Sequence, residues 1–125
     1  MGETKDWRDL PGNTFADDGG IPARPDEAVL TLAKGAPNRE AFLELWENRW
    51  MHNPKYKGDD SHADWQLTKY LLYWTGNHKS QTNRLFERSG LMRSKWRDRV
   101  NSGGSGHSYG EVTIHNAVAF STWQA

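Results

Sequence analysis

The chain has 125 residues, of which 35% are hydrophobic and none is cysteine, so it suits one compact core and excludes a disulfide framework or a thiolate metal site. No stretch approaches the roughly 18 apolar residues of a membrane span, and the first residues are too polar for a signal peptide, which predicts a cytoplasmic protein with no membrane partner. The net charge is zero, but residues 1–60 carry 8 Lys and Arg against 12 Asp and Glu, whereas residues 61–125 carry 8 against 4, so a polyanion should meet the second half.

The first predicted element is an irregular arm. Residues 1–23 contain many Gly and Pro and show no sustained hydrophobic period, which predicts a linker or a loosely docked arm. Three apolar side chains would anchor it, namely Trp7, Leu10 and Phe15. Residues 24–125 are then predicted to form one helix-bundle domain.

The first helix is predicted to run from Pro25 to about Lys34. Proline suits the first helical position, and the acidic Asp26 and Glu27 suit the positive first turn. Three apolar residues are expected on its inward face, namely Val29, Leu32 and Ala33.

The second helix is predicted to begin after the N-cap Asn38 and to end near Met51, because Asn53-Pro54 forces a turn. Its apolar residues recur at helical spacing and are Phe42, Leu45, Trp46 and Trp50.

The third helix is predicted over residues 62–75. Ser61 and Asp64 have the spacing of a capping box, and Gly76 suits a left-handed stop. This interpretation makes Asp64 a helix cap and not a catalytic base. The residues expected to face inward are Ala63, Leu67, Tyr70, Leu71 and Trp74.

The rest of the chain predicts two more helices. One begins near Asn77 or His78 and stops at Ser89-Gly90, with Leu91 folding back, and a short turn around Trp96 follows over residues 94–99. Residues 101–106 predict a mobile Gly/Ser loop, and a last helix begins at the N-cap Thr113. Its inward residues would be Ile114, Ala117, Val118 and Ser121. We therefore expect an all-α compact bundle of about five helices.

The sequence carries no recognisable catalytic or metal-binding motif. The five histidines, His52, His62, His78, His107 and His115, include no H-x-x-x-H or H-E-x-x-H pair, so no zinc site is predicted. The glycines at 103–106 lack the Gly-Lys-Ser/Thr of a phosphate-binding loop, and no Asp-x-Asp pair lies on a predicted strand. No catalytic residue is predicted.

The candidate binding site is the basic stretch from Arg84 to Arg99. Its cations are Arg84, Arg88, Arg93, Lys95, Arg97 and Arg99, opposed within the stretch only by Glu87 and Asp98. Several guanidiniums could converge on phosphates of DNA or of a nucleotide, with Lys95, Arg93 and Arg88 as the first choices. The alternative is a solvated charged face, with Arg84 in a buried salt bridge to Asp64 or to another carboxylate.

Four motifs between residues 61 and 117 resemble a known family. They are Ser61-x-x-Asp64, Tyr73-Trp74-Thr75-Gly76, Arg84-Leu85-Phe86-x-x-Ser89-Gly90-Leu91-Met92-Arg93-x-Lys95-Trp96, and Tyr109-Gly110-x-x-Thr113-Ile114-x-x-Ala117. Together they are similar to the helix-bundle domain that follows the catalytic domain in phage and plasmid primase-polymerases of the archaeo-eukaryotic primase superfamily.

The resemblance implies a function without a catalytic centre. The chain would be an accessory part of a multi-domain DNA primase/DNA polymerase, and it would bind single-stranded template DNA and the initiating nucleotide. No intrinsic cofactor is implied; ATP or another nucleoside triphosphate would arrive as a ligand with Mg²⁺. The partners in the same polypeptide would be a primase catalytic domain and a helicase domain, in a bacterial, archaeal or phage-infected cell. Two rivals remain open: a spacer between those domains, and an independent nucleotide hydrolase.

Overall fold

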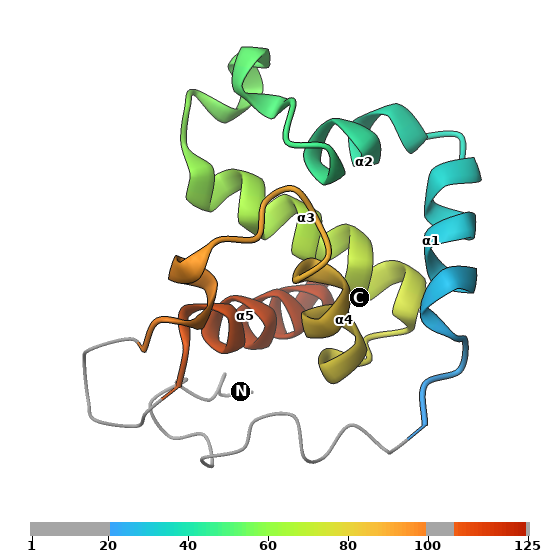
Figure 1. The fold of residues 1–125 in the computed structure, drawn as a ribbon. Coiled ribbons are helices and arrows are strands. Elements are labelled where there is room, and N and C mark those ends of the chain that lie inside the picture. Colours follow the sequence, from blue (N-terminus) through green and yellow to red (C-terminus); the bar gives the residue numbers. More distant parts are fainter. Residues whose placement is uncertain (1–20, 100–106, 125) are drawn as a thin grey trace.

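The computed structural model describes residues 21–99 and 107–124, with side chains up to Phe120 in the last helix. These residues form five α-helices, and their only strand-like contact is an isolated bridge between Arg99 and Ser108, so the all-α prediction is confirmed (Figure 1). The α-helices are α1 (Asp26–Gly35), α2 (Arg39–Trp46), α3 (Asp60–Thr75), α4 (Lys79–Phe86) and α5 (Tyr109–Gln124). Three short 3-10 helices join them, η2 (Trp50–His52), η3 (Pro54–Tyr56) and η4 (Ser94–Arg97). None of the helices described is long and apolar enough to cross a bilayer.

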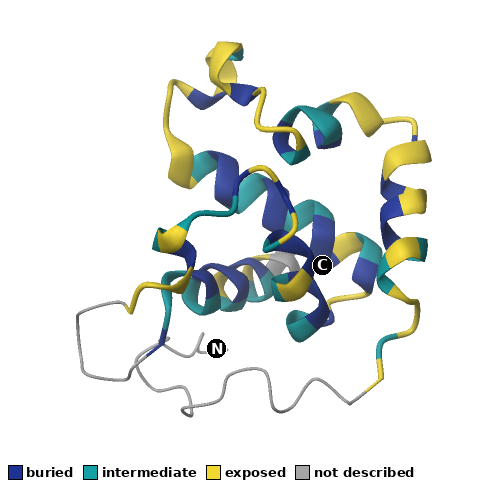
Figure 2. Ribbon diagram, in the orientation of Figure 1, coloured by how far each residue is buried: buried dark blue, intermediate teal, exposed yellow. Residues whose placement is uncertain are grey.

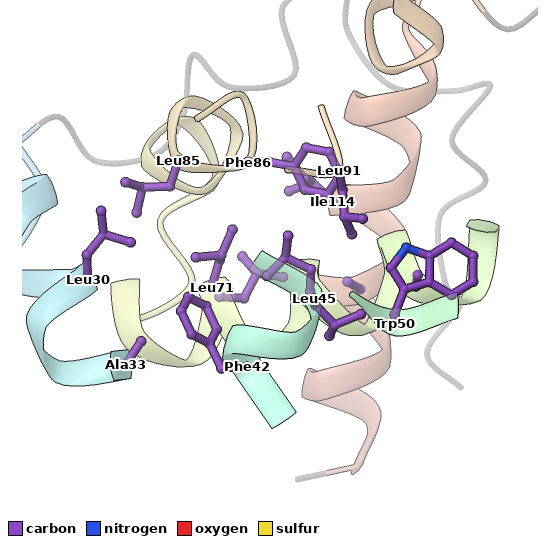
Figure 3. Packing of buried hydrophobic residues seen from close by; sticks show 14 of the residues in the cluster. Leu30, Ala33, Phe42, Leu45, Trp50, Leu71, Leu85, Phe86, Leu91 and Ile114 are labelled. Carbon is purple, nitrogen blue, oxygen red and sulfur yellow. The ribbon is translucent and has the colours of Figure 1, made fainter. Parts of the chain in front are cut away.

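α3 is the centre of the bundle. It contacts α1, α2, α4 and α5, and its buried residues form a stripe along the helix (Figure 2). All five helices contribute to one apolar core, whose members include Leu30, Phe42, Leu71, Phe86 and Ile114 (Figure 3). This shared core holds the helices together, because no single helix can bury its apolar face alone.

α1 follows the predicted bounds but turns a different leucine inward. Val29 and Ala33 are buried as predicted, whereas Leu32 is 39% exposed and Leu30 is buried in its place. At 100° per residue the two leucines flank the Val29–Ala33 line on opposite sides. α1 packs against α2 and α3, and Leu30, not Leu32, belongs to the core they share, so tertiary contacts decide between the two leucines.

α2 ends five residues earlier than predicted. The backbone of Asn48 is left-handed, with φ of 59°, and the Trp46 carbonyl accepts a hydrogen bond from the Gly90 N–H at 2.8 Å. A Cβ on Gly90 would lie 2.9 Å from that carbonyl oxygen, so this close approach requires glycine. Trp50 is nevertheless buried, because the chain re-enters the core through η2.

α3 begins two residues earlier than predicted, and its cap was misassigned. Asp59 is the N-cap, and its carboxylate accepts from the Ser61 N–H at 2.9 Å. The predicted capping box of Ser61 and Asp64 is wrong, since Asp64 is fully buried among the residues of the inward stripe. Gly76 does adopt the predicted left-handed conformation, with φ of 71°.

α4 begins directly after His78, as predicted, but ends at Phe86, before the predicted stop at Ser89-Gly90. His78 caps α4 by accepting from the Gln81 N–H at 3.2 Å, and Leu91 folds back into the core. Trp96 is buried in η4, where its ring stacks on Phe86 with centroids 3.5 Å apart. The predicted mobile loop, residues 101–106, lies outside the described residues, as do Trp7, Leu10 and Phe15.

α5 begins four residues before the predicted start. Ser108 and Glu111 form the true capping box: Ser108 Oγ accepts from the Glu111 N–H at 3.1 Å, and Glu111 Oε1 accepts from the Ser108 N–H at 2.8 Å. Thr113 lies inside the helix, where its hydroxyl donates to the Tyr109 carbonyl. Ile114 and Ala117 are buried as predicted, Val118 is half-buried, and the Ser121 side chain lies outside the part described.

Candidate nucleic-acid interface

The predicted basic stretch is divided between two ends of the bundle. Arg84 on α4 and Arg88 just after it face the start of α1, whereas Arg93 and Lys95 lie against the start of α3, on the other side of α4 (Figure 1). The cations therefore do not converge on one point. Each makes contacts within the fold, and their ion pairs include Arg84–Asp26, Arg88–Glu27, Arg93–Asp60, Arg93–Asp64, Lys95–Asp60 and Arg97–Glu87. Arg99 also interacts within the fold.

Of the two cations that face the start of α1, Arg84 forms a bidentate ion pair with Asp26. Arg84 donates through Nε to Asp26 Oδ2 at 2.9 Å and through NH2 to Asp26 Oδ1 at 2.7 Å. The Arg84 side chain is about half exposed, so the alternative of a buried pair is wrong for this residue, although its partner is a carboxylate. The hydrogen bonds from Arg84 lower the pKa of Asp26 to about 2.

This pKa predicts an acid-dependent contribution to stability. Because the folded-state pKa of Asp26 lies below its ordinary value of 3.8, its stabilisation is present above about pH 4 and is lost as the pH falls towards 2. The contribution should be about 1 kcal/mol, since solvent screens the half-exposed Arg84. Urea unfolding between pH 2 and 5 should show a shallower pH slope for Asp26→Asn than for the unchanged chain. Parallel slopes would contradict it, and Glu47→Gln, in an exposed pair with Arg49, is the control.

The group at α3 is built around the buried Asp64. Arg93 donates to both carboxylate oxygens of Asp64, at 3.0 and 2.8 Å, and the Tyr109 hydroxyl donates to Oδ2 at 2.7 Å. Burial, with the Asp64 carboxylate adding to it, raises the pKa of Tyr109 to about 12, and the hydrogen bonds to Asp64 raise the pKa of Arg93. These contacts join α3, the segment before η4, and α5, so Arg93 is first of all a structural residue.

Lys95 and Arg97 are held more loosely. Lys95 Nζ lies 3.8 Å from an Asp60 oxygen and 4.5 Å from the centroid of the Tyr109 ring. Arg97 pairs with Glu87 at 2.9 Å, and its side chain is 68% exposed. Exposed pairs of this kind contribute about 0–1 kcal/mol, so a phosphate can compete for these cations.

A hollow of about 260 Å³ adjoins Arg93. The residues that line it are Asn48, Trp50, Met51, Asp60, Gly90, Leu91, Met92 and Arg93. The charged residues of this lining are Arg93 and Asp60, and beside them lie the amide of Asn48 and the thioethers of Met51 and Met92. Such a lining can accommodate a flat ring beside a charged group. Among the described residues, no three His, Asp or Glu side chains converge to hold a metal ion.

One sequence-based alternative pairs Arg84 with Asp64 in a buried salt bridge, but in the structure Asp64 pairs with Arg93 and Arg84 pairs with Asp26. A signal for Asp64 existed, because Leu67 and Leu71 lie three and seven residues further along the same helical stripe. A carboxylate on an apolar stripe predicts a buried ion pair, since an unpaired buried charge is costly. The identity of its partner could not be read, because Arg93 lies 29 residues away.

The fold and this surface define a small helix-bundle module. Comparison with known protein families identifies the module. A family model described as the NrS-1 polymerase HBD domain matches residues 60–123, from the start of α3 almost to the end of α5. The chain belongs to this family of NrS-1 polymerase HBD-like domains, which confirms the resemblance seen in the sequence and makes it an accessory helical domain of the phage primase-polymerase kind.

One relative places the match within a larger protein. The DNA primase-polymerase of Nitratiruptor phage NrS-1 is 34% identical over 83 residues, which cover 65% of this chain. The matched part is only 11% of that protein, so the chain corresponds to a small portion of its relative. No solved structure gives a significant match.

Proposed function

We propose that this module binds single-stranded template DNA and the initiating nucleoside triphosphate, and so supports primer synthesis by a primase catalytic domain in the same polypeptide. The observation that carries the proposal is that three cations, Arg88 facing α1 and Lys95 and Arg97 in η4, are exposed and loosely paired in a chain that belongs to a primase-polymerase domain family. The proposed contacts to DNA phosphates are made by Arg88, Lys95 and Arg97.

The choice among the cations follows from how each one is paired. Glu27, the partner of Arg88, is 78% exposed, so little is lost when a phosphate replaces it. Arg93 is different, because releasing it would leave Asp64 buried with a single hydroxyl donor. In this proposal Arg93 keeps its pair with Asp64 and forms part of the wall of the hollow.

The hollow beside Arg93 suits the nucleotide. Met51 and Met92 offer polarizable surface for a base, and Arg93 and the neighbouring Lys95 offer positive charge for phosphates. Mg²⁺ would arrive bound to the triphosphate.

A triple substitution tests the DNA-binding surface. Arg88→Gln, Lys95→Gln and Arg97→Gln together should weaken binding of single-stranded DNA by about 10- to 100-fold at low salt. They should also reduce the slope of log affinity against log salt by about 0.7 for each DNA phosphate that the variant no longer neutralises. Fluorescence anisotropy at several salt concentrations measures both quantities.

The control carries the same charge change elsewhere. Lys34, Lys55 and Lys57 are exposed on the acidic half, and their replacement by Gln should leave most of the affinity intact. Arg93 is left unchanged, because its replacement would leave the Asp64 carboxylate buried without its cation. Equal losses in the two triple variants would refute the proposed surface.

The alternative function is a spacer between the primase catalytic and helicase domains. The observation favouring it is that acidic partners already neutralise the cations from Arg84 to Arg97. A spacer should show no salt-sensitive binding of single-stranded DNA, with or without ATP and Mg²⁺. That result would replace the proposed function with the spacer role.

A further inference from the structure

A second hollow lies on the face of α3 that points away from Asp64. It has a volume of about 300 Å³ and is lined by Asn38, Gln66, Lys69, Tyr70 and Tyr73. At 100° per residue, the four residues from α3 fall on one stripe roughly opposite Asp64. This hollow, called here the Tyr73 hollow, is therefore separate from the one beside Arg93, and it reaches the lower end of the range of about 300–1,000 Å³ found for small-ligand sites.

Packing in the core does not account for an aromatic residue at position 73. Its side chain is 74% exposed, and it is absent from the core cluster that Tyr70 and Trp74 join. Its ring lies perpendicular to that of Trp74, with centroids 4.9 Å apart, and this is the ring contact that the structure gives it among the described residues. A large aromatic ring on the rim of a hollow is a surface on which a flat ligand can stack.

The charge around the hollow favours an anionic ligand. Its lining contains one cation, Lys69, and no carboxylate. Among the residues described, no Asp or Glu forms an ion pair with Lys69, in contrast to the cations near α4 and η4. Its ammonium lies instead 5.1 Å from the centroid of the Phe120 ring and 5.9 Å from that of Trp65. Lys69 is thus available to a phosphate at no cost in broken ion pairs.

We propose that the Tyr73 hollow takes an unstacked base of single-stranded DNA. The base stacks on the Tyr73 ring, the side-chain amides of Asn38 and Gln66 hydrogen-bond to its edge, and Lys69 contacts the adjoining phosphate. The inference rests on the proposed function, because it assumes that the module binds single-stranded DNA. It adds a contact on the opposite side of α3 from Arg93, and this contact depends on the bases and not only on the phosphates.

The test compares two strands that differ only in their bases. The full chain and its Tyr73→Ala variant are titrated with a fluorescent single-stranded oligonucleotide and with an abasic oligonucleotide of equal length and charge. Tyr73→Ala should weaken binding of the normal strand by about tenfold and leave binding of the abasic strand unchanged. Tyr73→Phe keeps the ring and should bind like the unchanged chain. Leu32→Ala, at an exposed apolar position on α1, is the matched surface control.

The outcomes separate the two claims. Unchanged binding of the normal strand by Tyr73→Ala, or equal losses on both strands, would overturn the base-stacking site and leave the proposed function standing. Failure of the unchanged chain to bind either strand would overturn both. Circular dichroism checks that Tyr73→Ala is folded; a loss of affinity with Tyr73→Phe as large as that with alanine would also count against stacking.

Discussion

Replacing Arg93 by alanine is expected to destabilise the bundle by about 3–5 kcal/mol, more than removal of any other cation between Arg84 and Arg97. The substitution leaves the Asp64 carboxylate fully buried, with the Tyr109 hydroxyl as its remaining side-chain donor. Uncompensated buried charge accounts for losses of this size when one partner of a buried pair is removed. Urea unfolding followed by tryptophan fluorescence measures the change in the free energy of unfolding.

Removing the other partner of this pair, in Asp64→Ala, should reduce the free energy of unfolding by less. In Asp64→Ala the guanidinium of Arg93, 31% exposed and already 3.4 Å from Asp60, can turn to that carboxylate and to water. Replacing both partners, as Asp64→Leu with Arg93→Met, should recover much of the loss, because neither charge remains buried. If Arg93→Ala costs no more than Arg97→Ala, which breaks an exposed pair, the structural role assigned to Arg93 is wrong.

Replacing Gly110 by alanine is expected to destabilise the bundle by about 2–3 kcal/mol, although alanine normally favours a helix. A Cβ at this position would lie 2.4 Å from Cε2 and 2.6 Å from Nε1 of Trp96. That ring cannot retreat, since it stacks on Phe86 and its Nε1 donates to Asn83 Oδ1 at 2.9 Å. Overpacking of a well-packed site costs energy of this order. The thermal midpoint should fall accordingly.

A matched substitution separates crowding from helix propensity. Gly35, at the end of α1, has no atom within 4 Å of an added Cβ, so Gly35→Ala should be neutral or stabilising by up to about 1 kcal/mol. Combining Gly110→Ala with Trp96→Phe should cost less than the sum of the two single changes, because the smaller ring makes room. Strict additivity would show that the contact between Gly110 and Trp96 is not the cause.

Much of the helical order could be predicted from local signals. Proline near the start of α1, Asn53-Pro54 before α3, the left-handed Gly76 and the Ser89-Gly90 stop all act through the backbone of a few neighbouring residues. Such signals depend on steric limits and on hydrogen bonds inside one turn. They are therefore visible without knowledge of the rest of the chain, and the number and order of the α-helices followed from them.

Some errors occurred where distant residues meet, and others where a local cap was assigned to the wrong residue. α2 stops early where its last carbonyl bonds to Gly90, whereas the early start of α5 has a local cause, the capping box of Ser108 and Glu111, which the sequence-based prediction did not use. The capping box predicted at Ser61 is absent because the Asp64 side chain is buried and pairs with Arg93. Local spacing could not show that Asp64 is taken up by a partner 29 residues away.

The same division holds for the candidate site. The sequence by itself determined where the cations are concentrated, between residues 84 and 99. It also determined the family, through its motifs. The tertiary structure alone decided which of the cations are tightly and which are loosely paired, because several of their carboxylate partners come from α1 and α3. In the structure Arg93 has a structural role, and the proposed contacts to DNA phosphates are Arg88, Lys95 and Arg97. Tyr73 was identified only from the structure, because its exposure depends on how the helices pack.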